Sequence, residues 1–169
     1  MNPFEKVLSA VRQKRPLVHF ITNYVTANDC ANITLALGGS PIMADDLREV
    51  EQIVGHCSAL VLNMGTLSER TVQSMLAAGE EANRLGRPVV FDPVGVGASR
   101  FRNETAEMLL REVRFDVIKG NSSEIAYLAE GSGTTKGVDA NLDALSTEGN
   151  LNRHADRARK VSARTGAVI

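Results

Sequence analysis

Six short apolar runs, separated by longer segments, constrain the fold of this chain more than any other feature. The runs are 17–21, 41–43, 59–63, 89–92, 116–119 and 167–169. They are continuously apolar rather than alternating, which is typical of strands that are covered on both faces. Because the segments between them look helical, the order predicts an α/β fold in which a mostly parallel sheet lies between two layers of helices.

The longer segments carry helical signals. In 68–85, apolar residues recur on one helix face, Ser68 can cap the start, and Gly86 can end the helix. We expect three further helices: one capped by Asn103, one running from Asn121 to near Gly131, and one over 151–165.

The stretch 131–150 is long, polar and rich in Gly, Ser, Thr and Asn, which predicts a mobile surface loop. The last apolar run has only three residues, 167–169, although a strand of this kind normally continues and pairs. We therefore expect residues 1–169 to form a single domain that is the N-terminal portion of a larger, incomplete one.

Composition excludes several classes of protein. Nineteen basic and twenty acidic side chains give a net charge of −1, which argues against a general nucleic-acid binder. The sequence holds neither a membrane-spanning apolar stretch nor an N-terminal signal segment, so we expect a cytoplasmic protein without a membrane partner. The two cysteines, Cys30 and Cys57, are expected to be reduced, buried thiols.

Polar residues or glycines follow nearly every predicted strand. In open parallel sheets, ligands bind beyond the carboxyl ends of the strands. The residues found there are Thr22, Asn23, Asp45, Asn63, Gly65, Asp92, Gly95, Lys119 and Asn121. The pattern predicts a small-molecule site at this edge of the sheet.

Two common phosphate-binding motifs are not matched. Gly95 and Gly97 begin a dinucleotide-like pattern, but the third glycine position holds Arg100, so the signal is weak. The sequence also has no glycine-rich loop that ends in Gly-Lys-Ser/Thr.

The segment from Asn121 to Glu124 has two interpretations, and the residues leave both open. The first is a capping box, which alone explains an Asn cap with Glu at the third helical position. The second adds Lys119 and the positive end of the helix, which together favour phosphate. A glutamate beside phosphate then needs a divalent cation, and Asp92 could supply a second carboxylate for Mg²⁺.

Several blocks of the sequence resemble hydroxyethylthiazole kinase of thiamine biosynthesis, a family of the ribokinase-like superfamily. They are PLVHFITNYVTANDCANITLALGGSPIMA (16–44), LVLNMGTLS (60–68), VVFDPVGVGAS (89–99), KGNSSEIAYLA (119–129) and GVDA (137–140). The resemblance implies a ribokinase-like three-layer α/β/α sandwich. It also implies transfer of the ATP γ-phosphoryl group, with Mg²⁺, to the primary alcohol of 4-methyl-5-(2-hydroxyethyl)thiazole. The family is typically a homotrimer with active sites at the subunit interfaces.

The resemblance further implies three sets of site residues. These are Asn23, Val25 and the backbone of Met43 for the thiazole, Asp92 and Glu124 for Mg²⁺ and phosphate, and Lys119 and Asn121 for ATP. The position of Lys119 is often Arg in the family, and lysine contributes a point charge rather than a forked contact.

The resemblance does not supply a catalytic residue. In the segment that follows, the family carries a Thr-Gly pair near ATP and then a glycine-rich anion hole with a cysteine, and that segment is not part of these 169 residues. Cys30 and Cys57 do not match that cysteine. The histidines are not expected to be bases, because His19 fits a hydrogen-bonded core position, and the other two, His56 and His154, are expected at the surface.

Three functional hypotheses follow. The first is a thiazole kinase, and the second is another ribokinase-like kinase of small alcohols, of the hydroxymethylpyrimidine kinase type. The third is a truncated, catalytically inactive protein that binds the thiazole without turning over ATP. The block around Asn23 favours the thiazole family over the second hypothesis.

Overall fold

The computed structural model describes residues 2–131 and 150–169, in which helices and strands alternate. The strands are β1 (Leu17–Ile21), β2 (Ser40–Met43), β3 (Ala59–Asn63), β4 (Val89–Asp92) and β5 (Val117–Ile118). The helices are α1 (Pro3–Lys14), α2 (Ala27–Leu37), α3 (Val50–His56), α4 (Glu69–Arg84), α5 (Arg100–Glu112), α6 (Ser122–Glu130) and α7 (Leu151–Thr165). The first five predicted strands and the helices expected over 68–85, from Asn121 and over 151–165 are confirmed to within two residues.

The strands form one parallel sheet in the order β2-β1-β3-β4-β5. The register pairs Asn63 with Asp92, so the polar ends of β3 and β4 lie side by side. The predicted sixth strand, 167–169, is wrong as a strand. Val168 makes a single parallel bridge to Val117, because only its own N–H and C=O join the edge of β5.

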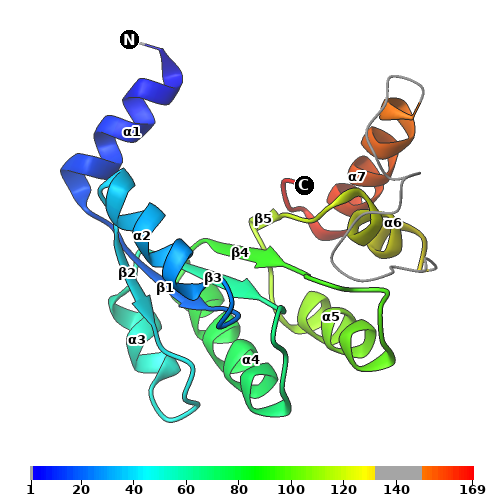
Figure 1. The fold of residues 1–169 in the computed structure, drawn as a ribbon, viewed down its shortest axis with the longest axis horizontal. Helices are drawn as coiled ribbons and strands as arrows, with labels where there is room; N and C mark the ends of the chain where they lie inside the picture. Colours follow the sequence, from blue (N-terminus) through cyan, green and yellow to red (C-terminus); the bar gives the residue numbers. More distant parts are fainter. Residues whose placement is uncertain (1, 132–149) are drawn as a thin grey trace.

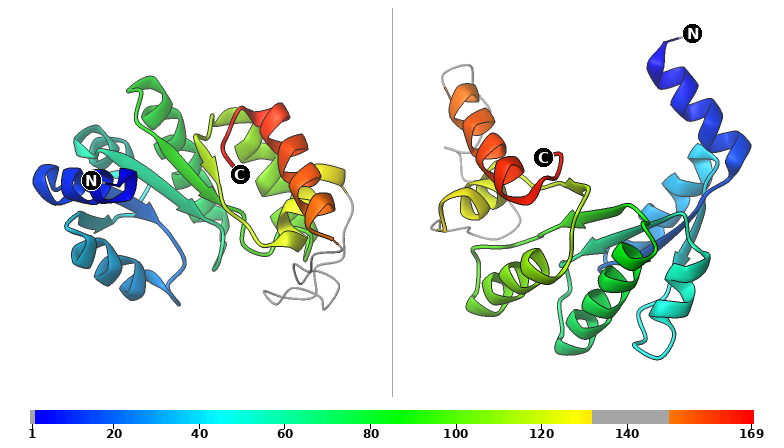
Figure 2. Two further views of the ribbon diagram at one scale, coloured as in Figure 1. Left: turned by 90° about the horizontal axis from the view of Figure 1, so that it is seen from above. Right: turned by 180° about the vertical axis from the view of Figure 1, so that it is seen from behind.

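Helices cover both faces of the sheet. Figures 1 and 2 show α3, α4 and α5 along one face, and α2 together with α6 and α7 over the other. The apolar core between these layers is aliphatic apart from Phe91 and Phe115, whose rings stack with centroids 4.6 Å apart. The structure is therefore the expected three-layer α/β/α sandwich with a parallel sheet. The edge strand β2 departs from the expectation of two covered faces, because none of its residues is fully buried in this chain.

The caps were predicted correctly at two helices and wrongly at one. Ser68 caps α4 by accepting the Thr71 N–H, and α6 ends at Gly131, whose φ of +68° is left-handed. Helix α5 begins earlier than expected because the Ser99 hydroxyl accepts the Arg102 N–H. Asn103, the predicted cap, instead accepts the Gly97 N–H at 2.6 Å and holds the preceding turn.

The three histidines differ in their surroundings. His19 is fully buried and its Nε2 lies 2.7 Å from the Ala44 carbonyl oxygen, so the predicted core histidine is confirmed. Burial lowers the pKa of His19 from its ordinary value. His56 is exposed as predicted. The prediction for His154 is wrong, because it is half-buried between α6 and α7 and both of its ring nitrogens are shielded from solvent.

The cysteines also differ from each other. Both are free, and Cys57 is buried as predicted. Cys30 is only half-buried and lines a cavity, so its prediction as a buried structural thiol is wrong.

The predicted polar loop, apart from its two end residues, and the GVDA block lie outside the described residues. Within the described ranges, no helix is long and apolar enough to cross a membrane.

Candidate functional site

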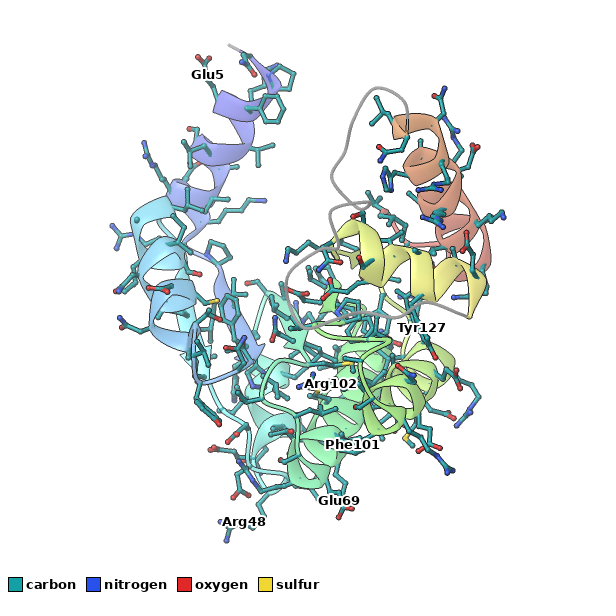
Figure 3. All side chains as sticks on the ribbon, turned by 45° about the vertical axis from the view of Figure 1, so that its right-hand side comes forward. Glu5, Arg48, Glu69, Phe101, Arg102 and Tyr127 are labelled. Carbon is teal, nitrogen blue, oxygen red and sulfur yellow. The ribbon has the colours of Figure 1, made fainter. Side chains whose placement is uncertain are left out.

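A cavity of about 820 Å³ lies at the carboxyl ends of β1, β3 and β4, at the edge of the sheet where the sequence predicts a site. It is lined by Asn23, Val25, Thr26, Cys30, Asn63, Gly65, Thr66, Asp92, Val94, Gly95, Ala98, Arg102 and Lys119. Its size falls within the range of small-molecule sites, and it combines apolar and polar walls as such sites do. Figure 3 shows Arg102 lying toward the centre of the molecule, in contrast to Arg48 and Glu69 at its periphery.

Asn23 organises the end of β1. Its Oδ1 accepts hydrogen bonds from the backbone N–H of Val25 (3.1 Å) and of Thr26 (2.9 Å) and from the Thr26 hydroxyl (3.1 Å). Its Nδ2 donates to Asn63 Oδ1 at 2.9 Å. Asn23 therefore fixes the turn into α2 and ties the end of β1 to the end of β3.

Gly65 is required by the close approach of Asn23. A Cβ built on Gly65 would lie 2.4 Å from the Cβ of Asn23, closer than two carbon atoms can come without a shift. Glycine at this position lets the turn after β3 pass directly beside the asparagine.

Asn63 continues the connection to Asp92. Its Oδ1 also accepts the Gly65 N–H at 2.9 Å, which fixes the orientation of its amide. Its Nδ2 then donates to Asp92 Oδ2 at 3.0 Å. Hydrogen bonds thus run without interruption from the turn at Thr26 to the carboxylate at the end of β4.

Asp92 has one occupied oxygen and one without a partner. Lys119 Nζ also donates to Oδ2 at 3.0 Å, so both donors bind the same atom. Oδ1 is shielded from solvent and has no hydrogen-bond partner among the described residues. The Asp92 side chain is 14% exposed, whereas that of Lys119 is 72% exposed and can move toward a ligand.

Glu124 is bonded differently. It is 4% exposed, and its Oε1 accepts the Gly95 N–H at 2.9 Å. Its Oε2 accepts the Asn121 N–H at 2.8 Å, while Asn121 Oδ1 accepts the N–H groups of Ser123 and Glu124. The capping-box interpretation of this segment is therefore confirmed, and Glu124 also ties α6 to the turn after β4.

The fit of Mg²⁺ to this edge of the sheet rests on Asp92. Within the described ranges no group of three or more His, Cys, Asp or Glu side chains could hold a metal. Mg²⁺ needs only one or two carboxylates, with waters and phosphate oxygens completing its shell. The free Asp92 Oδ1 meets that need. Glu124 keeps one further acceptor lone pair on each oxygen.

The structure brings together four of the seven predicted site residues as cavity lining: Asn23, Val25, Asp92 and Lys119. Glu124 and Asn121 stand behind this wall and hold the start of α6. Met43 is not part of the lining. It ends the edge strand β2 and is 39% exposed.

Two residues whose hydrogen bonds shape the cavity, Asn63 and Arg102, were given no role from the sequence. Asn63 was noted only as the end of a strand. Arg102, on α5, donates to the carbonyl oxygens of Met64, Gly65 and Val94. Burial lowers the pKa of the Arg102 guanidinium. A contact with backbone carbonyls carries no side-chain pattern, so no motif in the sequence indicated this role.

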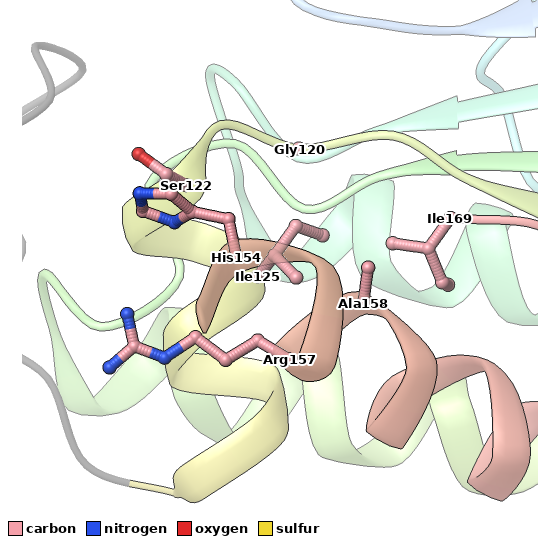
Figure 4. Close-up of a pocket in the computed structure, with 7 residues that line it drawn as sticks. All are labelled: Gly120, Ser122, Ile125, His154, Arg157, Ala158 and Ile169. Atoms are coloured by element: carbon pink, nitrogen blue, oxygen red, sulfur yellow. The ribbon is translucent and has the colours of Figure 1, made fainter. Parts of the chain in front are cut away.

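A second, smaller cavity of about 230 Å³ lies between α6 and α7. Figure 4 shows the residues that line it: Gly120, Ser122, Ile125, His154, Arg157, Ala158 and Ile169. Arg157 pairs with Glu130 at 2.7 Å. The turn between β5 and α6 borders both cavities, because Lys119 faces the larger one and Gly120 and Ser122 face the smaller one.

Comparison with known proteins gives one consistent match. The sequence model of the hydroxyethylthiazole kinase family matches residues 8–169. The hydroxyethylthiazole kinase of Desulfovibrio desulfuricans is 57% identical over all 169 residues, which correspond to 59% of its own length. That of Clostridium acetobutylicum is 56% identical over 96% of this chain, again across 59% of its length.

A solved structure described as hydroxyethylthiazole kinase protein from Pyrococcus horikoshii superposes with a TM-score of 0.82 at 37% identity, covering 96% of this chain and 57% of that one. The chain thus spans somewhat more than half the length of the relatives it matches. With a matching family model and relatives well above half identical, the chain belongs to the hydroxyethylthiazole kinase family.

Proposed function

We propose that this protein phosphorylates the primary alcohol of 4-methyl-5-(2-hydroxyethyl)thiazole with ATP and Mg²⁺, in thiamine biosynthesis or salvage in the cytoplasm. The printed names of its relatives support the reaction. The observation that carries the proposal is the free Oδ1 of Asp92, which lies at the cavity wall next to the Lys119 ammonium group.

The thiazole would occupy the part of the cavity near the end of β1. Val25, Cys30 and Ala98 give this cavity apolar surface for a ring, and Asn23 and Thr26 give it polar groups. Asn23 and Val25 would contact the substrate there. Met43, which ends β2 outside the lining of this cavity, would do so through its backbone.

The triphosphate would occupy the part near the end of β5. Lys119 and the N–H groups at the start of α6 add positive potential there, which favours phosphate, and Asn121 shapes this start as the cap. Both cavities border this turn, so ATP can approach along it.

Asp92 would hold Mg²⁺ through Oδ1, and Glu124 would stand behind it as a second carboxylate that holds Gly95 and Asn121 and does not bind the ion directly. When bound, the ion neutralises charge on the phosphate oxygens during transfer. Phosphoryl transfer is mostly a matter of positioning and charge neutralisation. The role of this chain is to keep the alcohol and the phosphate in line across the Asn23–Asn63–Asp92 connection. We assign no general base to the residues present.

We also propose a homotrimer whose active sites lie at subunit interfaces. Tyr24 and Val25, in the turn beside the cavity, are 82% and 73% exposed in this chain, and α2 exposes Ile33 and Leu35. Apolar surface of this extent beside a binding cavity is typical of an interface. Light scattering on the purified protein tests the trimer, and a monomeric mass at working concentration contradicts it.

The test of the activity is an incubation with ATP, Mg²⁺ and one alcohol at a time, with the products identified by mass spectrometry. We expect the thiazole phosphate with the thiazole alcohol and little product with hydroxymethylpyrimidine. Preference for the pyrimidine supports the alternative kinase. Calorimetric binding of the thiazole without turnover supports the catalytically inactive binding protein.

A further inference from the structure

The Arg102 side chain makes contacts that serve neither helix formation nor charge pairing. It lies on α5, and its guanidinium donates to Met64 O and Gly65 O after β3 and to Val94 O after β4, the last at 2.8 Å. Within the described ranges no carboxylate pairs with it. One side chain therefore holds the two turns that form the cavity wall on either side of Asp92.

Each turn contains a peptide unit that is held at both ends. In the unit that joins Met64 to Gly65, the C=O accepts from Arg102 and the N–H donates to Asn63 Oδ1. In the unit that joins Val94 to Gly95, the C=O again accepts from Arg102 and the N–H donates to Glu124 Oε1. The two peptide planes cannot rotate without breaking a hydrogen bond to a charged or amide side chain.

Arginine suits this role better than lysine. Its planar guanidinium presents five donors in a fixed fork, whereas an ammonium is a point charge on a flexible stem. A lysine could satisfy one of the two turns but could not span both in a fixed geometry. The contact with Arg102 also favours glycine at position 95. An added Cβ would lie 3.3 Å from Arg102 Cδ, and the φ of Gly95 is +74°.

We propose that Arg102 is a positioning residue: it fixes the turns after β3 and β4 and so sets the geometry of the wall on which the alcohol lies, between Gly65 and Asp92. The role in turnover rests on the proposed function, whereas the fixing of the two turns does not. Displacement of reacting groups by about 1 Å can cost about 10²-fold in rate, so loosening this wall should be visible in the kinetics.

The experiment compares Arg102→Lys with Arg100→Lys in the whole protein. Arg100 lies on the same helix, is exposed and, among the residues that the structure describes, pairs only with Glu104 at 2.6 Å, so it is the matched control. The readouts are kcat and KM for each substrate, the thermal midpoint, and hydrogen exchange at the Gly65 and Gly95 amides. Arg102→Gln gives the same readouts if the lysine variant does not fold.

We expect Arg102→Lys to lower kcat/KM for the alcohol by about 10- to 100-fold while KM for ATP stays within about twofold. Exchange at Gly65 and Gly95 should quicken by about tenfold or more, and Arg100→Lys should change neither. Wild-type kinetics in Arg102→Lys overturns the proposal. So does exchange at Gly65 and Gly95 that this substitution quickens no more than exchange elsewhere in the chain. If the wild-type protein phosphorylates no thiazole, the proposed function fails, and the exchange at the two glycines still decides the role of Arg102.

Discussion

Asp92 at the end of β4 and Glu124 at the start of α6 are acidic residues on two sides of one turn, yet they are bonded in opposite ways. Asp92 has two donors on one oxygen and none among the described residues on the other. Glu124 has one backbone N–H on each oxygen. A carboxylate with a free, shielded oxygen is available to a ligand, whereas one with both oxygens engaged holds the structure together.

Asp92 and Glu124 were predicted to have the same role, but their hydrogen bonds suit them to different ones: Asp92 to ligand binding and Glu124 to holding the turn. Glu124 fixes Gly95, Arg102 fixes Val94, and the turn they hold begins at Asp92. The position of Asp92, the carboxylate that we propose binds Mg²⁺, therefore depends on groups that need not touch the substrate. Substitutions at Asp92, Glu124 and Asn63 should separate the two roles.

The largest effect is expected from Asp92→Asn. The variant keeps the size of the side chain and can keep an oxygen facing Asn63 and Lys119, so folding should change little. Loss of the free carboxylate oxygen should lower Mg²⁺-dependent turnover by on the order of 10²-fold. Steady-state rates over a Mg²⁺ titration, with the thermal midpoint, measure this.

The control for Asp92 is Asp46→Asn, which removes an exposed carboxylate that pairs with Arg48. It should leave turnover unchanged. Wild-type turnover in Asp92→Asn would remove Asp92 from the site.

The next effect is expected from Glu124→Gln, and it should fall on stability. The amide can accept one of the two backbone N–H groups, but its own NH₂ then faces the other donor in a buried position. We expect the free energy of unfolding to drop by about 1–3 kcal/mol, as measured by denaturant titration. If stability is unchanged and turnover falls as far as in the Asp92 variant, Glu124 is a direct ligand and the contrast is wrong.

A smaller effect is expected from Asn63→Ala, which removes the link between Asn23 and Asp92. We expect kcat/KM for the alcohol to fall by about tenfold, because Asp92 loses one of two donors that orient it. Asn83→Ala is the control, since the Asn83 side chain makes two hydrogen bonds to the backbone of Arg114, where that of Asn63 makes three. Equal kinetic losses in the two variants would show that Asn63 acts through stability alone.

The smallest effect is expected from His19→Gln. It should change the pH dependence of the free energy of unfolding, through a buried group away from Asp92 and Glu124. Burial lowers the pKa of His19 below its ordinary value of 6.5, so the folded state favours the neutral ring. The unfolded chain takes up a proton below that pH, so the contribution of His19 is present above about pH 6.5 and is lost as the pH falls toward the folded pKa. Denaturant titrations between pH 5 and 8 should show a shallower decline in His19→Gln than in the wild type.

His56→Gln, at an exposed histidine, serves as the control and should keep the decline of the wild type. A decline in His19→Gln as steep as in the wild type would assign the pH dependence to other groups.

Much of this arrangement could be predicted from the sequence because it follows from the order of short apolar runs and helical segments. The runs ending at Asn63 and Asp92 were predicted as strands of a parallel sheet, and parallel strands bring their carboxyl ends to one edge. The capping box at Asn121 is a local pattern of residue types, so it too could be predicted from the sequence. The prediction of a sixth strand over 167–169 failed because three apolar residues do not determine how a segment pairs with the sheet.

The hydrogen-bond partners of the site residues could not be predicted from the sequence in the same way. Asn103 has a capping residue type, but Ser99 lies one turn earlier and competes for the start of α5. Arg102 acts on backbone carbonyls, which every residue has, so only the fold reveals its partners. The contrast between Asp92 and Glu124 depends on which donors face each oxygen, and residue types alone do not specify that.

We propose that Asp92 Oδ1 is the protein ligand of the magnesium ion that accompanies ATP. A crystal structure of the protein with Mg²⁺ and a non-hydrolysable ATP analogue tests it most directly. We expect the ion about 2.0–2.1 Å from Asp92 Oδ1, with Asn63 still bonded to Oδ2. An ion bound to the triphosphate with Asp92 outside its coordination shell would contradict the account.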